Sequence, residues 1–197
     1  MAVRDIAPGA QTFDSRIAAA RAGSSWACTT LWVEYAPAVA AFLTARGSRE
    51  PEDLTSEVFL TAFDKLGDFV GGEPEFRSFV FTIAYRRLID ELRVRYRRGE
   101  TVELSAGSDP RHAPSAEDVA LRELGDDSAL RLFDALPAPQ RDVMVLRIVA
   151  DLTVEQIAHA LGKRPGAIKA LQRRALDSLR KNFSPDRTLL HRASDSE

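Results

Sequence analysis

The sequence predicts an all-helical protein built from two small helical domains that are joined by a flexible acidic linker. Apolar residues recur at intervals of three and four positions and seldom at two, which indicates amphipathic helices rather than strands. Residues 85–98 contain six arginines and two acidic residues, and residues 163–181 contain seven cations and one acidic residue. Between them, residues 99–128 contain eight acidic and two basic residues. This alternation of charge predicts two basic domains on either side of an acidic connection.

The composition narrows the class of protein. A chain of 197 residues that is 45% hydrophobic can bury one medium core or two small ones. No apolar run is long enough for a membrane span, and residues 1–11 lack the features of a secretory signal, so we expect a cytoplasmic protein without a membrane partner. Cys28 has no internal disulfide partner, and a lone thiol in an apolar helix is more often buried than redox-active. His112, His159 and His191 are too scattered to predict a metal site, and we expect no cofactor.

The first domain, residues 1–98, is expected to form a bundle of three or four helices. The periodicity predicts helices over residues 24–46, with Pro37 as a point where the helix could bend, and over residues 52–66 and 75–98. The second of these can pack inward through Leu54, Val58, Ala62 and Leu66. The domain is therefore expected to bury one face of each helix in a shared core.

The acidic linker is expected over residues 99–127, the second domain over residues 128–183 and a fraying polar tail over residues 184–197. A helix should begin near Ser115, an N-cap candidate that is followed three positions later by Asp118. Further helices are predicted over residues 139–150, 154–161 and 165–182.

The last two helices carry the clearest local signals. Thr153 can cap the first of them, and Gln156 stands at the reciprocal position of a capping box. Gly162 suits the left-handed conformation that ends a helix, and Pro165 suits the first turn of the next one. Because Ala158 is small enough for a close helix crossing, this segment is typical of a helix-turn-helix, whose second helix enters the major groove of DNA.

The second of these helices has an apolar face and a cationic face. Ile168, Leu171, Ala175 and Leu179 share the apolar face. A solvated basic helix in an ordinary bundle is the simpler alternative, but the cationic face coincides with the helix-turn-helix signals and therefore favours DNA binding. The candidate duplex-binding residues are Arg164, Lys169, Ala170, Gln172, Arg173 and Arg174.

The helix predicted over residues 75–98 combines aromatic and cationic side chains. Its second half has one apolar face, formed by Phe81, Tyr85, Leu88, Leu92 and Tyr96, opposite Arg86, Arg93 and Arg97. Phe76, Phe79 and Ile83 precede the arginines on the side that becomes basic. Single-stranded nucleic acid favours such a surface, because bases stack on rings while cations follow the backbone. On residue types alone, burial of these three side chains under a neighbouring helix is an equally good interpretation.

Asp53 and Glu57 stand one helical turn apart in the helix predicted over residues 52–66. Paired carboxylates can indicate acid–base catalysis, but this spacing is more typical of a solvated or ion-pairing surface. No histidine, nucleophile or phosphate-binding loop lies nearby in the sequence. The protein is therefore not expected to be an enzyme.

Three stretches, in this order, resemble the sigma-70 family of bacterial transcription initiation factors: EDLTSEVFLTAFDKL, FVGGEPEFRSFVFTIAYRRLIDELRVRYRR and LPAPQRDVMVLRIVADLTVEQIAHALGKRPGAIKALQRRALDSLR. The chain is most similar to the short extracytoplasmic-function (ECF) type, which keeps only conserved regions 2 and 4. The resemblance covers about residues 13–183, with region 2 in the first domain and region 4, the helix-turn-helix, in the second.

The resemblance implies three partners: core RNA polymerase, through its largest-subunit coiled coil and flap, promoter DNA, and an anti-sigma factor. It assigns the polymerase contact to Asp53, Ser56 and Glu57, with Ser56 where the family often has glutamine. The loop of residues 71–76 would capture a flipped base of the minus-ten element, and the next helix would hold the melted strand. The implied minus-ten residues are Gly72, Phe76, Phe79, Arg86, Arg87 and Arg93, which favours DNA contact over burial for Phe76.

The remaining implied roles concern the second half of the chain. Lys169, Arg173 and their neighbours would read the minus-thirty-five element, and the acidic linker would run through the polymerase cleft. The expected function is thus that of a dissociable sigma factor that recognises both promoter elements and promotes transcription initiation. The main alternative is a stand-alone helix-turn-helix repressor or activator, which would bind a duplex operator without polymerase. A nuclease is a more distant alternative, because the basic faces lack clustered acidic metal ligands.

Overall fold

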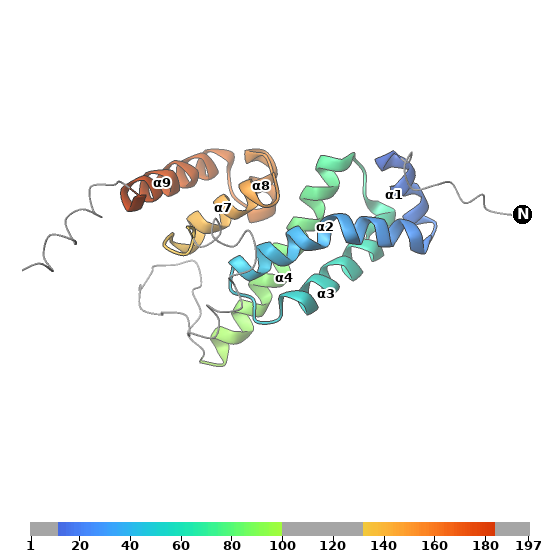
Figure 1. Ribbon diagram of the computed structural model, residues 1–197, viewed down its shortest axis with the longest axis horizontal. Helices are drawn as coiled ribbons and strands as arrows, with labels where there is room; N and C mark the ends of the chain where they lie inside the picture. The colour runs from blue at the N-terminus through green and yellow to red at the C-terminus, as the bar shows by residue number, and fades with distance from the viewer. Residues whose placement is uncertain (1–11, 100–131, 184–197) are drawn as a thin grey trace, which may run out of the picture.

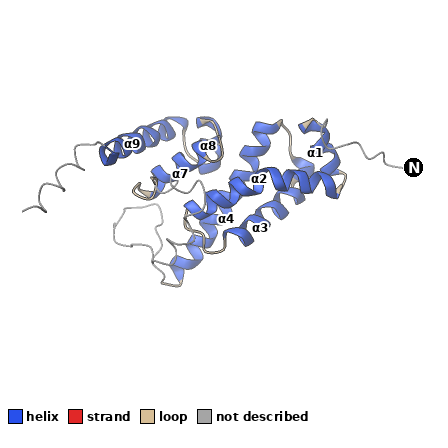
Figure 2. Ribbon diagram, in the orientation of Figure 1, coloured by secondary structure: helices blue, strands red, loops and turns tan. Residues whose placement is uncertain are grey.

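The computed structural model describes residues 12–99 and 132–183, and the regular elements in these two stretches are all helices (Figure 2). The first stretch, here the first module, contains α1 (Phe13–Arg21), α2 (Ser25–Ala45), α3 (Pro51–Asp64), the short 3₁₀ helix η1 (Leu66–Asp68) and α4 (Glu73–Arg97). The second module contains α7 (Ala138–Ile148), α8 (Val154–Leu161) and α9 (Pro165–Phe183). The all-helical fold class is confirmed, and α2, α3, α4, α7, α8 and α9 match their expected ranges to within two residues.

Several expectations fall outside the described residues. They are the acidic linker, the helix expected to begin near Ser115 and the tail after residue 183. The start of the chain, residues 1–11, lies outside them as well.

Helix α1 is an element that the sequence did not predict. Its first turn is capped by Thr12, whose Oγ1 accepts a hydrogen bond from the backbone N–H of Ser15 at 3.3 Å. Only Ile17 and Ala20 are buried in this helix, so its apolar periodicity is weak and gives little signal. With α1, the first module contains four α-helices, in agreement with the expected three or four.

An aromatic core holds the first module together. α2, α3 and α4 pack against one another (Figure 1). Phe42, Phe59, Phe76 and Phe81 are among the largest fully buried side chains. The Phe42 and Phe81 rings meet edge to face, with centroids 5.8 Å apart. Burial of one such side chain contributes about 1.5 to 3 kcal/mol. Tyr96, expected on the apolar face of α4, is instead 62% exposed and lies in the last turn of that helix.

The second module forms the expected helix-turn-helix. The capping box is present: Oγ1 of Thr153 accepts from the N–H of Gln156 at 3.2 Å, and Oε1 of Gln156 accepts from the N–H of Thr153 at 2.9 Å. Gly162 ends α8 with φ at +62°, in the left-handed region that glycine adopts without strain. Ile168 and Ala175 are fully buried and anchor α9 against α7 and α8.

The two modules touch each other directly. α8 lies against α4, and α7 meets α2 (Figure 1). Arg46, at the C-cap of α2, and Asp142 of α7 form an ion pair in this contact. Segments that lie far apart in the sequence are therefore brought together beside α4, the helix with the mixed aromatic and cationic surface.

Candidate nucleic-acid interface

The cationic face of α9 is open to solvent. Lys169, Arg173 and Arg174 are exposed, as is Arg164 in the turn before the helix. Ala170 and Gln172 are half-buried at the margin of this face. Because Ile168 and Ala175 are fully buried on the opposite side, the helix cannot rotate its cations inward without breaking its core contacts. The core contacts of α9 therefore hold its cationic face toward solvent.

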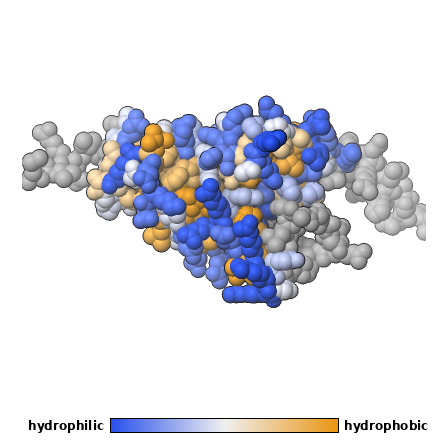
Figure 3. All heavy atoms as spheres, turned by 180° about the vertical axis from the view of Figure 1, so that it is seen from behind, coloured by the Kyte–Doolittle hydropathy of each residue, from blue (hydrophilic) through white to orange (hydrophobic). Residues whose placement is uncertain are grey.

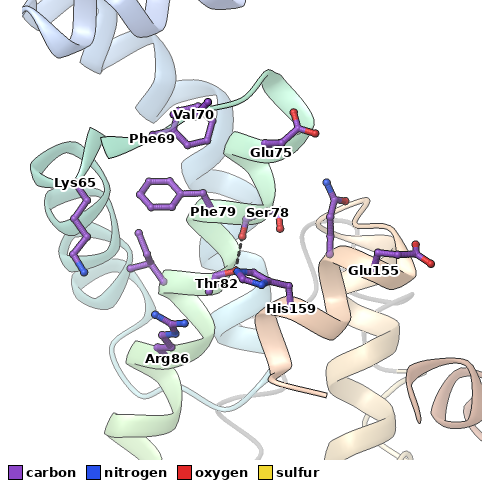
Figure 4. Close-up of a pocket in the computed structure, with 12 residues that line it drawn as sticks. Lys65, Phe69, Val70, Glu75, Ser78, Phe79, Thr82, Arg86, Glu155 and His159 are labelled. Carbon is purple, nitrogen blue, oxygen red and sulfur yellow. Dashed lines mark hydrogen bonds between the residues drawn. The ribbon is translucent and has the colours of Figure 1, made fainter. Parts of the chain in front are cut away.

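The surface of α4 has a pocket of about 510 Å³ (Figure 4). Phe79, Ile83 and Arg86 of α4 line it, together with Phe69 and Val70 of the loop before α4. Phe79 is half-buried, and its ring centroid is 5.5 Å from that of Phe69. Arg86 is exposed at the other end of the pocket. Aromatic and cationic side chains thus line the same pocket.

Phe76 does not belong to this surface. It is fully buried, and its ring contacts Phe13, Tyr35, Phe69 and Phe79 at centroid distances between 5.3 and 6.3 Å. A base could reach this ring only if the cluster came apart. Phe76 is therefore a core residue, which corrects the expectation that it stacks on DNA.

Two of the arginines that were expected to contact the minus-ten strand have partners within the protein. Nη2 of Arg87 donates to Oγ1 of Thr61 at 2.9 Å, so this side chain reaches toward α3. Nη1 of Arg93 donates to Oδ1 of Asp90 at 3.4 Å on its own helix. Both arginine side chains keep substantial exposure, 44% and 66%. Such exposed pairs contribute little to stability.

The loop before α4 is shaped by glycine. Gly71 has φ at +144°, and a Cβ at this position would lie 2.5 Å from Cβ of Glu75. The next residue, Gly72, is the N-cap of α4, and its N–H donates to Oε2 of Glu75 at 2.9 Å. Val70, immediately before the two glycines, is 90% exposed. The loop therefore presents an apolar side chain at its tip, and a larger residue at position 71 would adopt this backbone only with strain.

The carboxylates of α3 lie on an exposed face. Asp53, Ser56 and Glu57 are all exposed, and Oγ of Ser56 donates to the carbonyl of Glu52 at 3.1 Å. Leu60, one turn further along, is 71% exposed. On the opposite side Val58 and Ala62 are buried as expected, Leu54 packs against the core, and Phe59 is buried as well. Leu66, also expected to pack inward, is buried in η1. Acidic, polar and apolar groups therefore share one outward strip.

Titratable groups in the contact between the modules are strongly affected by burial. Burial raises the pKa of the Asp142 carboxyl, while the Arg46 guanidinium opposes that shift. Burial, and then the nearby Asp142, raise the pKa of the Tyr85 hydroxyl to about 12.

Within residues 12–99 and 132–183, no cluster of His, Cys, Asp or Glu side chains is arranged to hold a metal ion. No helix in the same stretches is long and apolar enough to cross a bilayer.

Two families match the chain. Sigma-70 region 2 matches residues 31–98, and Sigma-70, region 4 matches residues 132–181. The ECF RNA polymerase sigma factor RpoE of Cereibacter sphaeroides is 32% identical over 156 residues, which cover 78% of this chain and 84% of the relative. This chain belongs to the sigma-70 family, in its ECF branch.

Another ECF relative is longer than this chain. The ECF RNA polymerase sigma factor BldN of Streptomyces coelicolor is 32% identical over 171 residues, which cover 85% of this chain but 64% of BldN. Among solved structures, the sigma factor RpoE bound to the anti-sigma factor NepR from Bartonella quintana superposes with a TM-score of 0.58. At 24% identity, over 78% of this chain and 94% of that one, this likeness supports the fold.

The two family matches coincide with the modules. Region 2 spans α3, α4 and most of α2, and region 4 spans α7 to α9. Helix α1 precedes the region 2 match. Most residues that line the pocket beside Phe79 therefore belong to region 2, and α8 of region 4 supplies the rest.

Part of this pocket could not have been found from the sequence. Lys65, Ser78 and Thr82 line it, and α8 contributes Glu155, Gln156 and His159 (Figure 4). Lys65 follows α3, and Ser78 and Thr82 lie in α4. The apolar periodicity of these helices indicates which residues face inward, but not which ones line a pocket. The α8 residues come from a helix about seventy positions away in the chain, and no local pattern carries that tertiary contact.

Proposed function

We propose that this chain is an ECF RNA polymerase sigma factor that binds core polymerase, recognises the minus-thirty-five and minus-ten promoter elements and promotes transcription initiation. The observation that carries the proposal is the presence of both matched regions in one chain, each with an outward cationic surface on the helix expected to meet DNA. In this role the chain is a specificity subunit of the polymerase and not an enzyme. It would act in the cytoplasm, where polymerase and promoters are found.

The exposed strip of α3 is the proposed polymerase contact. Asp53, Ser56 and Glu57 would bind the coiled coil of the largest subunit, and the flap would be a further contact. Leu60 adds an exposed apolar side chain to the same strip. An apolar residue surrounded by polar ones is a common composition for a protein-binding surface. The strip lies on the side of α3 away from the fully buried Val58, which leaves it accessible to a partner.

The exposed face of α9 is the proposed reader of the minus-thirty-five element. Lys169, Arg173 and Arg174 would reach phosphates or base edges from the major groove, with Arg164, Ala170 and Gln172 at the margins. Each phosphate contact releases counterions from DNA, so binding should weaken as salt rises.

The pocket and the loop before α4 are the proposed minus-ten surface. Phe79 offers an aromatic ring, Arg86 a cation, and the loop with Gly72 and the exposed Val70 a site for an unstacked base. Arg87 and Arg93 would follow the strand once their internal partners release them. Base flipping costs a few kcal/mol, which stacking and polymerase contacts together can offset.

An anti-sigma factor is the proposed regulatory partner. The sigma factor from Bartonella quintana, which has a similar fold, was solved in complex with one. A two-domain helical chain with an exposed polymerase-binding strip offers such an inhibitor a surface to cover.

Run-off transcription tests the proposed function. Purified core polymerase would be combined with a pool of promoter fragments, with and without this protein, and new transcripts would be sequenced. We expect specific transcripts only when the protein is present. Tight binding of the isolated protein to a symmetric duplex operator, without any polymerase dependence, would instead show a stand-alone regulator.

A further inference from the structure

The loop before α4, residues 69–72, has a composition that does not hold one shape by itself. Two of its four residues are glycines, and glycine loses more conformational freedom than any other residue when a chain becomes ordered. Val70 in this loop is 90% exposed. On the face seen in Figure 3, apolar and hydrophilic spheres are interspersed over the first module. A loop of this kind needs polar anchors at both ends to keep a single conformation.

Both ends of the loop are anchored, and the two anchors come from different helices. At the α4 end, the N–H of Gly72 donates to Oε2 of Glu75 at 2.9 Å. At the η1 end, Arg21, the last residue of α1, donates from Nε to the carbonyl of Leu66 at 3.0 Å and from Nη2 to the carbonyl of Phe69. A guanidinium can serve two carbonyls at once because its donors form a rigid planar fork.

We propose that Arg21 is a positioning residue for minus-ten recognition. It holds the loop before α4 in the shape that receives the unstacked base, and it does so through the protein backbone without touching DNA. This inference rests on the proposed function of that loop. It assigns a role in promoter recognition to α1, which precedes the region 2 match that begins at residue 31.

The Phe69 backbone is well placed to pass this restraint on. The Phe69 ring is buried and lies 5.6 Å from the core ring of Phe76 and 5.5 Å from the pocket ring of Phe79, between centroids. A Cβ added at Gly71 would lie 3.4 Å from Cζ of Phe69, so the loop folds back over this ring. A guanidinium that fixes the Phe69 carbonyl therefore fixes the start of the loop beside the ring proposed to stack on a base.

The expected benefit of this anchor is preorganisation. A loop that is ordered before DNA arrives does not lose conformational freedom when the base enters, so capture is tighter. Without Arg21, the Phe69 carbonyl would lose this donor, while the Leu66 carbonyl would keep the hydrogen bond from the Phe69 N–H at 3.3 Å. The weakening should therefore appear in the capture of the base and not in contacts to phosphates.

A direct phosphate contact is the competing role, because the Arg21 residue as a whole is exposed. The two roles make different demands on the side chain. A phosphate contact depends mainly on positive charge, which lysine also supplies, whereas the loop anchor depends on the planar fork. Loss of one phosphate contact would also reduce the salt dependence of single-strand binding by about 0.7 in the slope of log affinity against log salt.

Abasic oligonucleotides separate base capture from phosphate binding. Holoenzyme assembled from the full-length protein would bind a single strand with the minus-ten sequence of a promoter found by run-off transcription. The same strand would then carry one abasic site at each position in turn, and the site that weakens wild-type binding most marks the captured base. For Arg21→Ala we expect the affinity ratio of intact to abasic strand to fall about tenfold, with the abasic affinity and the salt slope unchanged.

Two further variants show whether the anchor itself is responsible. Arg21→Lys keeps the charge and the aliphatic stem, and should lower the ratio as Arg21→Ala does; it also replaces that variant if alanine reduces helical content by circular dichroism. Arg16→Ala is the matched control, because it removes a guanidinium of α1 that pairs with Glu34 of α2. It should keep the wild-type ratio. Hydrogen exchange in residues 69–72 of the free protein should become faster in Arg21→Ala and not in Arg16→Ala.

The outcomes are distinct. Full rescue by Arg21→Lys, or a reduced salt slope, would identify a phosphate contact and overturn the inference. A wild-type ratio in both Arg21 variants, or an equal loss in Arg16→Ala, would overturn it as well. If no abasic site weakened binding of the wild-type holoenzyme, the proposed minus-ten loop itself would be rejected.

Discussion

Glu57 on α3 and Arg87 on α4 form an ion pair, with Oε2 and Nη1 3.7 Å apart, between the proposed polymerase contact and the proposed minus-ten surface. Both side chains are about half exposed, at 56% and 44%, so the pair adds little stability. The pair matters for the choice of variants, because a substitution of Glu57 would also remove a partner of Arg87. Asp53, for which no such cross-helix pair is found in the described structure, is the cleaner probe of polymerase binding.

Asp53→Arg should abolish binding to core polymerase while the fold stays intact. The residue is exposed in the first turn of α3, and reversal of its charge repels any basic partner surface without disturbing the core. Co-purification with tagged core enzyme measures the effect, and circular dichroism monitors the fold. Asp64→Arg is the matched control, since Asp64 is an exposed carboxylate at the other end of α3 and lies outside the proposed contact. Unchanged co-purification of Asp53→Arg would rule out the contact.

Arg173→Ala should weaken promoter binding by about 1 to 3 kcal/mol if the guanidinium reads a base. The loss should be largest on fragments with the preferred minus-thirty-five sequence, measured with the polymerase holoenzyme at fixed salt. Arg180→Ala is the control on the same helix, because Arg180 pairs with Asp177 at 3.2 Å near the end of α9. Equal losses on preferred and scrambled fragments would identify a phosphate contact instead.

Phe76→Ala should destabilise the first module by about 3 to 5 kcal/mol, since it removes a fully buried ring from an aromatic cluster. Phe79→Ala should cost clearly less, because that ring is only half-buried and faces the pocket. Urea unfolding followed by circular dichroism compares the two. Permanganate reactivity of promoter thymines should then show a loss of strand opening for Phe79→Ala. Equal stability losses would place Phe79 in the core as well.

Gly71→Ala should strain the loop before α4 by about 1 to 3 kcal/mol, because alanine disfavours the positive φ. The added Cβ would also collide with the side chain of Glu75. Gly67→Ala is the matched control, since a Cβ there meets no atom within 4 Å. Thermal unfolding measures stability, and abortive transcription measures promoter opening. Similar behaviour of the two variants would show that the loop tolerates a shift at Gly71.

The sequence was sufficient for the elements whose signals are local. The boundaries of α8 could be predicted because Thr153, Gln156 and Gly162 are a complete set of start and stop signals. The cationic face of α9 followed from its period and is exposed as expected. These features depend on residues within a few positions of one another, so no knowledge of the tertiary structure was needed.

The errors arose where packing decides the outcome. Phe76 and Phe79 have the same character and nearly the same place in the helical pattern, yet one is fully buried and the other lines the pocket. Neighbouring elements cause the difference, since Phe13 of the unpredicted α1 packs on Phe76. The contact of α8 with α4 was likewise beyond local patterns, because it depends on how two separately folded surfaces fit.

Helix α1 also affects how fragments of this protein should be chosen. Arg21 at its end donates from Nε to the carbonyl of Leu66 at 3.0 Å and from Nη2 to the carbonyl of Phe69. A fragment cut at residue 31, where the region 2 match begins, would lose this guanidinium anchor together with Phe13. The Phe69 carbonyl would then lose this donor, and the Leu66 carbonyl would keep only the hydrogen bond from the Phe69 N–H. Work on the isolated domain should therefore retain the chain from Thr12 onward.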